Sequence, residues 1–220
     1  MLIHNTVVGA FIANNEETKR FMASVKAEAG DSWKSGYDPD RAKTLVAKLK
    51  AANLFYRYKL QGKILWVETR ETTSQGGTHR KVWIAIGAED KYDILSLDIG
   101  TELCERLLPK LGAAVATLDP AAEVSLSAFP IQEERNGQMF WNFQPSLKSG
   151  DVEIKASKPH FQLANEKVKA AIEGLKTAGI TDPNVIKATR KSAKEAYFWD
   201  LAQMIAAYCA EHGRAQKTAA

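Results

Sequence analysis

Cysteine is scarce in this sequence of 220 residues, in which only Cys104 and Cys209 occur. Both lie in segments with helical spacing, where we interpret them as small buried side chains. A disulfide framework is therefore excluded, and a reducing cytosol is expected. No apolar run reaches the roughly 18 residues that a membrane helix needs. The apolar first residues lack the basic start and the cleavage site of a signal peptide. These absences predict a cytoplasmic protein without a membrane partner.

Motifs of catalysis and cofactor binding are also missing. The sequence has no glycine-rich phosphate loop. Its four histidines, His4, His79, His160 and His212, are scattered and show no zinc-binding spacing. Cys209 lies three residues before His212, but no second pair accompanies them. We therefore expect no metal, no cofactor and no enzymatic activity.

One tripeptide leaves an enzymatic alternative open. Glu153-Ile154-Lys155 has the E-x-K pattern of the PD-(D/E)xK nucleases, in which carboxylates hold Mg²⁺ and the lysine orients water or phosphate. Asp98 or Asp119 would have to supply the upstream acid, because the usual Pro-Asp order is absent. The simpler interpretation of the segment is an exposed strand edge with alternating side chains.

The net charge is only +4, but it is unevenly distributed. Residues 40–81 carry ten basic and three acidic side chains, whereas residues 82–157 carry six basic and twelve acidic ones. The first region thus has a net charge of +7 and the second a net charge of −6. A concentrated positive region predicts a polyanionic partner. The alternative is that the acidic region folds back onto the basic one and neutralises it.

The positive region overlaps a stretch, residues 54–88, in which aromatic and basic side chains are interleaved in strand-like runs. Flat rings stack on bases and basic side chains follow a phosphate chain, and both suit binding of single strands. Because side chains alternate along a strand, Phe55 shares a face with Arg57 and Lys59, Trp66 shares one with Arg70, and Trp83 shares one with Lys81. We expect these three faces to form a continuous platform, and the expected nucleic-acid-binding residues are Phe55, Arg57, Lys59, Lys63, Trp66, Arg70, Arg80, Lys81 and Trp83. The opposite faces then supply the core through Tyr56, Tyr58, Leu65, Val67, Val82, Ile84 and Ile86. In the alternative interpretation, Trp66 and Trp83 are core anchors.

Capping, turn and periodicity signals give the order of the elements. We expect helices at about 16–29, 39–53, 101–108, 161–178 and 183–212, with Pro109 ending or kinking the third. We expect strands at about 2–13, 54–60, 64–70, 80–87, 92–99, 124–131, 138–147 and 151–156. Turns are expected at 61–63 and 133–137, and a mobile loop at 72–78. In the strand at 138–147, alternation separates Phe140, Asn142 and Gln144 from Met139, Trp141 and Phe143.

A strand meander that is interrupted once by a helix is the order expected of the five-stranded Greek-key OB barrel. We therefore predict an α+β protein, in which an OB-like Greek-key β-barrel has flanking N- and C-terminal helices. Residues 1–157 form the expected OB-like β-barrel domain with its N-terminal strand and helices. Residues 158–220 form the expected C-terminal helical segment, packed on the barrel.

On this strand order, these aromatics and this basic charge, residues 54–157 resemble the phage-type OB-fold single-stranded DNA-binding proteins. The resemblance implies sequence-nonspecific binding of single-stranded DNA in phage DNA replication or recombination, in the host cytoplasm. DNA is favoured over RNA. The chain departs from many such proteins because its last residues are helical and slightly basic, so recruitment of partners by an acidic tail is not expected. A metal-dependent nuclease, a protein-binding regulatory module and a homo-oligomer formed through the C-terminal helices stay open.

Overall fold

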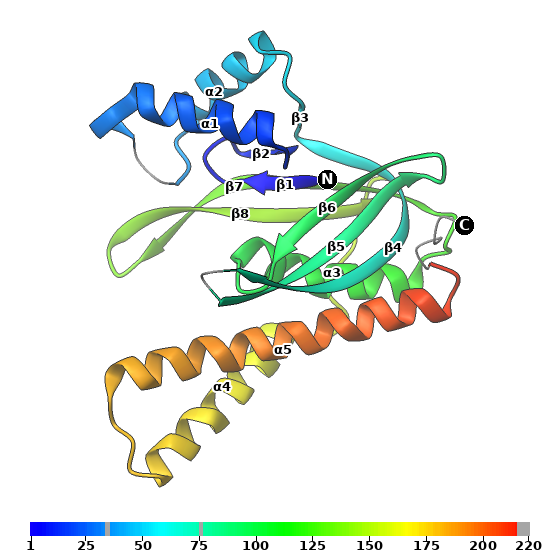
Figure 1. Cartoon of the computed structure of the whole chain (residues 1–220). Coiled ribbons are helices and arrows are strands. Elements are labelled where there is room, and N and C mark those ends of the chain that lie inside the picture. Colours follow the sequence, from blue (N-terminus) through cyan, green and yellow to red (C-terminus); the bar gives the residue numbers. More distant parts are fainter. Residues whose placement is uncertain (34–35, 75–76, 215–220) are drawn as a thin grey trace.

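The computed structural model describes residues 1–33, 36–74 and 77–214, which form an α+β structure (Figure 1). Its elements follow one another as β1 (Leu2–Asn5), β2 (Ala10–Ala13), α1 (Glu16–Ala29), α2 (Pro39–Ala51), β3 (Tyr56–Arg57), β4 (Lys59–Ser74), β5 (Gly77–Ala88), β6 (Lys91–Asp98), α3 (Glu102–Thr117), β7 (Glu123–Arg135), β8 (Gln138–Ser149), β9 (Val152–Glu153), α4 (His160–Thr177) and α5 (Pro183–Glu211). The α+β class predicted from the sequence is confirmed. The loop predicted at 72–78 is wrong at both ends, because residues 72–74 belong to β4 and residues 77–78 to β5, and its residues 75–76 lie outside the described residues.

The strands form one mixed sheet in the order β3-β2-β1-β6-β5-β4-β7-β8-β9. The sheet curls, but it does not close into the barrel predicted from the sequence. The edge of β6 is instead occupied by β1, which runs parallel to it with Leu2 opposite Leu95. The ring centroids of His4 in β1 and Phe143 in β8 lie 4.4 Å apart. Strands that are distant in the sheet order therefore face one another across the core.

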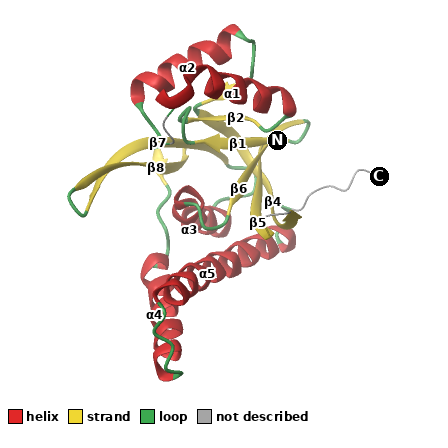
Figure 2. Ribbon diagram, turned by 60° about the vertical axis from the view of Figure 1, so that its left-hand side comes forward, coloured by secondary structure: helices red, strands yellow, loops and turns green. Residues whose placement is uncertain are grey.

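Two hydrophobic cores lie on opposite faces of the sheet. Leu2 and Phe11 point into the larger core, which α3 and α5 cover. The neighbouring side chain of Ile12 points into the smaller core, which α1 and α2 cover (Figure 2). Side chains alternate between the faces of a strand, so one hairpin supplies both cores. The single strand predicted at 2–13 is in fact this β1–β2 hairpin, because the Asn5 side chain accepts bonds from two turn amides.

The two strands and the turn predicted at 54–70 are in fact the short edge strand β3 followed by one long bent strand, β4. β4 pairs with β7 at its start and with β5 from Lys63 onward, so it crosses from one neighbour to the other without a turn. Gly62 makes this crossing possible at φ +132°, because a Cβ there would lie 2.5 Å from the Cα of Gly87. The glycine that suggests a turn in the sequence is used for a close approach of two strands instead.

The central helix α3 is longer than predicted, because Pro109 lies inside it and does not end it. A proline removes one backbone hydrogen bond and clashes with the preceding turn, at a cost of about 3 kcal/mol. The leucines on either side, Leu107, Leu108 and Leu111, are at most 1% exposed. Burying them contributes about 2 kcal/mol each, which outweighs the cost of the proline. α3 thus continues through the core to Thr117.

Four of the predicted helices are confirmed, and side chains cap three of them. Asn15 accepts from Thr18 at the start of α1, and Asp38 accepts from Arg41 at the start of α2. Asp182 caps α5 through two backbone amides. The second half of α5 packs on α3 and β4, whereas α4 and the first half of α5 project from the body (Figures 1 and 2). None of the helices within the described residues has the length and hydrophobicity to span a bilayer.

Gly62→Ala should lower the free energy of unfolding by about 2–4 kcal/mol, because the new Cβ meets the backbone of Gly87 and the left-handed φ is strained. Urea unfolding measures the change. Gly174→Ala in α4 is the matched control, since nothing lies within 4 Å of a Cβ at that position. It should leave stability equal or raise it by up to about 1 kcal/mol. Equal stability of Gly62→Ala and wild type would contradict the close approach.

His4 predicts an acid-dependent loss of stability. Burial between Phe11 and Phe143 lowers the pKa of His4 from 6.5 to about 4, and its Nε2 is buried with no hydrogen-bond partner. Between pH 6.5 and pH 4, His4 is protonated in the unfolded chain but stays neutral in the folded chain. The free energy of unfolding should therefore fall as pH falls from 6.5 towards 4. The expected loss is about 3 kcal/mol. Urea unfolding should show that His4→Phe removes this dependence and that His212→Gln retains it.

Candidate nucleic-acid interface

A β-bulge decides which side chains of β4 face away from the larger core. The register shifts between Ile64 and Trp66, so the residue between them has no partner in β5. Beyond the bulge, Val67 faces the larger core and alternate residues face outward. Directly paired residues share a face, and the outward set that we call the β4–β5 surface consists of Glu68, Arg70, Lys81, Trp83 and Asp98.

The β4–β5 surface presents one indole ring with a guanidinium group beside it. The Arg70 guanidinium carbon lies 5.0 Å from the centroid of the half-buried Trp83 ring. Arg70 also pairs with Glu68 at 2.7 Å, and the Lys81 ammonium pairs with Asp98 at 2.7 Å. The Nε1 of Trp83 is buried without a hydrogen-bond partner among the described residues. The three predicted residues Arg70, Lys81 and Trp83 are therefore brought together with an aromatic face and positive charge.

Trp66 does not belong to this platform, although it points to the same side of the sheet. It lies opposite the small side chain of Ala85 and edge-on to Tyr92, with 6.2 Å between the ring centroids. Only 3% of Trp66 is exposed, so a base has no access to its ring. The alternative interpretation of the sequence, in which the tryptophans are core anchors, is correct for Trp66.

Arg80 lies on the opposite face of β5 from Lys81. It pairs with Glu71 at 2.8 Å, and its guanidinium carbon lies 5.2 Å from the centroid of the Trp199 ring in α5. Arg80 therefore ties the β4–β5 hairpin to α5. The sequence predicts Arg80 in the nucleic-acid-binding set, and the structure corrects this: Arg80 does not share a face with Lys81 and Trp83, because neighbouring residues of a strand point to opposite faces.

The remaining predicted residues lie outside the β4–β5 surface. Arg57 belongs to the edge strand β3, where it stacks 5.0 Å from the Phe55 ring and pairs with Asp93 at 2.8 Å. Lys59 is exposed at the start of β4. Lys63 lines a hollow of about 380 Å³ together with Arg57. The continuous platform expected from the sequence is thus divided into separate parts.

The predicted core faces hold in β5 but not at the start of the stretch. Val67, Val82, Ile84 and Ile86 are at most 4% exposed. Tyr58 is 54% exposed, because it lies between β3 and β4 where the chain passes from one end of the sheet to the middle. Leu65 is only half-buried because it is the extra residue of the bulge.

Sequence reasoning missed the second group of exposed rings, which lies on the β7–β8 hairpin. Phe129 and Phe140 are 45% and 42% exposed on one face of the hairpin, and we call them the β7–β8 surface, whereas the exposed Met139 points to the other face. Pairing puts Phe140 opposite Glu133 on one face, as the alternation in QMFWNFQPSL indicates. The signal was therefore visible in the sequence, but it lay outside the positively charged region on which the prediction depended.

Further rings join the base of this hairpin to the loop before α2. The centroid of Tyr37 lies 5.2 Å from that of Trp141 and 5.3 Å from that of the buried Phe143. Burial raises the pKa of Tyr37, and the nearby Asp38 carboxylate adds to the effect. The pKa of the exposed Tyr58 is raised as well, first by partial burial and then by the neighbouring Tyr56 and Tyr37. Aromatic side chains from three segments thus gather beside the β7–β8 surface.

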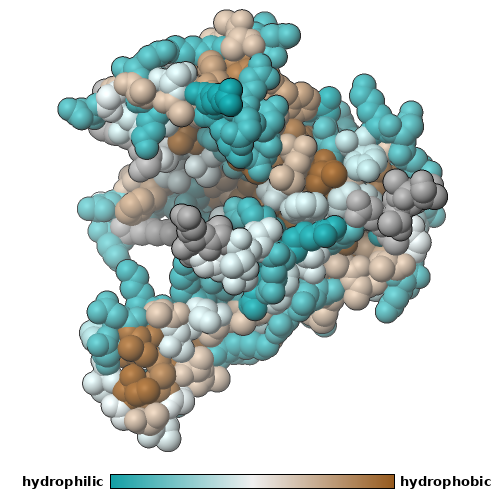
Figure 3. Space-filling model, viewed as in Figure 1, coloured by the Kyte–Doolittle hydropathy of each residue, from teal (hydrophilic) through white to brown (hydrophobic). Residues whose placement is uncertain are grey.

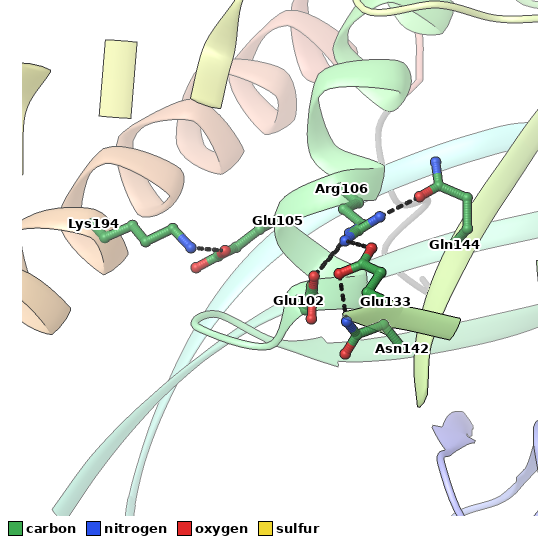
Figure 4. Close-up of polar contacts among 7 residues, drawn as sticks. All are labelled: Glu102, Glu105, Arg106, Glu133, Asn142, Gln144 and Lys194. Atoms are coloured by element: carbon green, nitrogen blue, oxygen red, sulfur yellow. Dashed lines mark hydrogen bonds and ion pairs between the residues drawn. The ribbon is translucent and has the colours of Figure 1, made fainter. Parts of the chain in front are cut away.

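Arg106 of α3 fixes the position of the β7–β8 hairpin (Figure 4). Its guanidinium donates to Glu102 in its own helix, to Glu133 in β7 and to Gln144 in β8, and Asn142 donates to Glu133. Burial alone would lower the pKa of Arg106, but the hydrogen bonds and charges of the two glutamates outweigh burial and raise it. This network, which we call the Arg106 network, holds the hairpin where its rings can face a ligand.

Ion pairing neutralises part of the positive region. Arg57 and Lys81 pair with Asp93 and Asp98 of the acidic region, as the alternative interpretation of the charge pattern predicts. Arg70 and Arg80 pair with carboxylates inside the positive region itself. These pairs are largely exposed, so each contributes at most about 1 kcal/mol. A phosphate can therefore take the place of a carboxylate at little cost.

The E-x-K tripeptide is occupied by other contacts. Glu153 accepts hydrogen bonds from Lys110 of α3 and Ser146 of β8. Burial would raise the pKa of Glu153, but the bonds from Lys110 and Ser146 lower it. Asp98, one expected upstream acid, pairs with Lys81. Across residues 1–33, 36–74 and 77–214, no three His, Cys, Asp or Glu side chains are grouped as metal ligands.

The chain matches no protein-family model and no curated protein. The assignment of the candidate interface therefore rests on the geometry of this chain alone. It consists of the β4–β5 surface and the β7–β8 surface, on two hairpins that leave the sheet on opposite sides of α3 (Figure 2).

Arg106→Met should lower the free energy of unfolding by about 2–4 kcal/mol, because it leaves Glu102 and Glu133 partly buried without their cation. Urea unfolding measures the loss, and adding Glu133→Gln should restore part of it. Lys19→Met is the matched control, since its pair with Glu16 is exposed and should contribute less than about 1 kcal/mol. Similar losses in the two single variants would show that Arg106 is an ordinary surface cation.

Proposed function

We propose that the chain binds single-stranded nucleic acid without sequence preference, DNA rather than RNA, and performs no chemistry on it. In this proposal the protein acts in the cytoplasm, in phage DNA replication or recombination. The observation that carries the proposal is the pair of hairpins: β4–β5 presents the half-buried ring of Trp83 beside the Arg70 guanidinium, and β7–β8 presents the exposed rings of Phe129 and Phe140. Aromatic stacking combined with basic side chains is how nonspecific single-strand binders hold their ligand.

The connectivity of the sheet supports an OB-like relationship. β4, β5 and β6 form a meander, α3 follows, and β7 returns to pair with β4 before β8 pairs with β7. The OB fold is a partly open Greek-key barrel of five strands, and it binds oligonucleotides on its second and third strands and on the loops after its first and fourth strands. Here these parts correspond to β5 and β6 and to the β4–β5 and β7–β8 hairpins. We therefore place the bound strand across the β4–β5 surface, between the two hairpins.

The energetics favour moderate, salt-dependent affinity. Stacking of one base is worth about 1–3 kcal/mol, and the exposed rings of Phe129 and Phe140 and the half-buried ring of Trp83 offer places for it. Each phosphate contact adds an ionic contribution that falls with salt, with a slope of about −0.7 per contact for single strands. Arg70 and Lys81 can make such contacts after exchanging their carboxylates for phosphates.

Trp83→Ala and Phe140→Ala should each weaken binding of labelled oligo(dT) about 5- to 100-fold, the loss of one stacked base. Fluorescence anisotropy at low salt without Mg²⁺ measures the dissociation constant. Phe161→Ala is the matched control, because Phe161 is 42% exposed but lies on α4 and belongs to neither hairpin. It should bind like wild type.

Arg70→Ala together with Lys81→Ala should make the salt dependence shallower by about 1.4 in log–log slope, because two phosphate contacts are lost. Lys43→Ala with Lys50→Ala, two substitutions on α2, removes the same charge and should leave the slope unchanged.

Absence of binding to DNA and RNA at low salt would refute the proposed function. Mg²⁺-dependent cleavage that Glu153→Ala abolishes would refute its non-enzymatic part.

A further inference from the structure

An arm formed by α4 and the first half of α5, residues 160–194, stands away from the body of the protein (Figures 1 and 2). Of the 18 residues of α4, only Ala164 is buried. The two helices pack on each other through an apolar stripe, and the side chains of that stripe stay half-exposed. They are Leu163, Val168, Ala171, Ile172, Leu175 and Ile186. We call this apolar stripe the seam. Its side chains are covered where α4 and α5 meet and are open on the side away from that contact.

Further apolar side chains lie open at the tip of the arm. Ile180 in the connecting loop is 38% exposed, and Val185 in the first turn of α5 is 41% exposed. Figure 3 shows hydrophobic residues gathered on the visible face of the arm's tip. A pair of helices without a third layer is marginal in water, because most helical stability comes from packing an apolar face. Covering the seam with a further apolar surface would therefore stabilise the arm.

We infer that a second copy of this chain covers the seam, so that two arms form a four-helix bundle with two-fold symmetry. A two-fold contact uses the same patch on both copies, so an apolar patch complements itself. The inference does not depend on nucleic-acid binding. Because the arm projects clear of the sheet, two arms can meet without a clash between the bodies (Figure 1).

The size of the arm fits a weak dimer. A helix of 18 residues is about 27 Å long, and two helices side by side are about 20 Å wide. The face measures about 500 Å² on each copy, or about 1,000 Å² in total, which is the lower limit of a specific interface. We therefore expect a dissociation constant in the micromolar range.

The charge of the arm gives the association a distinctive salt dependence. Residues 160–194 carry seven lysines and arginines against three acidic residues, a net charge of +4. Two arms repel each other at low ionic strength, and salt screens this repulsion. The dimer should therefore strengthen as salt is added. Binding of the arm to nucleic acid, the alternative use of the same charge, weakens with salt.

Sedimentation velocity of the full chain without nucleic acid tests the inference. At tens of micromolar, wild type should sediment with twice the mass of the 24.3 kDa chain, and more completely at high salt. The double variant Ile180→Lys, Val185→Lys should be monomeric with unchanged helical circular dichroism, because both side chains are exposed. Met204→Lys is the control, since Met204 is 62% exposed on α5 outside the arm, and it should still dimerise.

Each other outcome overturns the inference. A monomeric wild type at these concentrations shows that no second copy covers the seam. A dimer that survives the double variant, or that Met204→Lys abolishes, places the contact elsewhere on the molecule. A mass above two copies contradicts a closed two-fold contact. If the arm binds nucleic acid instead, the double variant should sediment with the same mass as wild type. The salt dependence of oligonucleotide affinity should then depend mainly on the lysines of the arm.

Discussion

The guanidinium of Arg106 joins three parts of the molecule that are distant in the sequence. From the centre of α3 it reaches β7 and β8, and one residue earlier Glu105, which is 4% exposed, pairs with Lys194 of α5 (Figure 4). A partly buried charge is tolerated only where its partners are fixed. The position of the β7–β8 hairpin and the direction in which α5 leaves the body both depend on the same stretch of α3.

Around α3 the curled sheet has faces that helices cover and faces that stay open to solvent. The core face of β4, β5 and β6 is closed by α3 and α5, and α1 and α2 cover the far end of the other face. What stays open is the β4–β5 surface, where Arg70 lies beside the Trp83 ring, and the protruding β7–β8 hairpin with its exposed rings. The arm is the other open feature, and its apolar seam differs in kind from the polar, ring-bearing hairpins. The two features suit different partners, a polyanion and a second copy of the chain.

Local signals predicted the helices and strands well. Asn15, Asp38 and Asp182 mark helix starts because capping depends only on neighbouring residues. Gly62 and Pro109 misled the prediction, because each is placed by long-range packing, a strand crossing in one case and a buried helix in the other. The β1 strand beside β6 could not be foreseen either, since parallel pairing leaves no local signature.

In the candidate site, alternation correctly put Trp83 on one face with Lys81 and Trp66 on one face with Arg70, because the period of a strand is set by the backbone, but only the strand pairing joins Arg70 to Lys81. It could not tell that Trp66 is covered by its surroundings. It also gave no weight to Phe140, whose exposure depends on how far the hairpin protrudes.

Photo-crosslinking of oligo(dT) to the full chain, followed by mass spectrometry of the modified peptides, tests the central claim most directly. Crosslinks should fall on the aromatic side chains of β5 and β8, at Trp83 and at Phe140, and disappear when unlabelled oligo(dT) competes. Crosslinks confined to α1 and α2, or to the arm at 160–194, would contradict the account, because they would place the bound strand on surfaces that the two hairpins do not form.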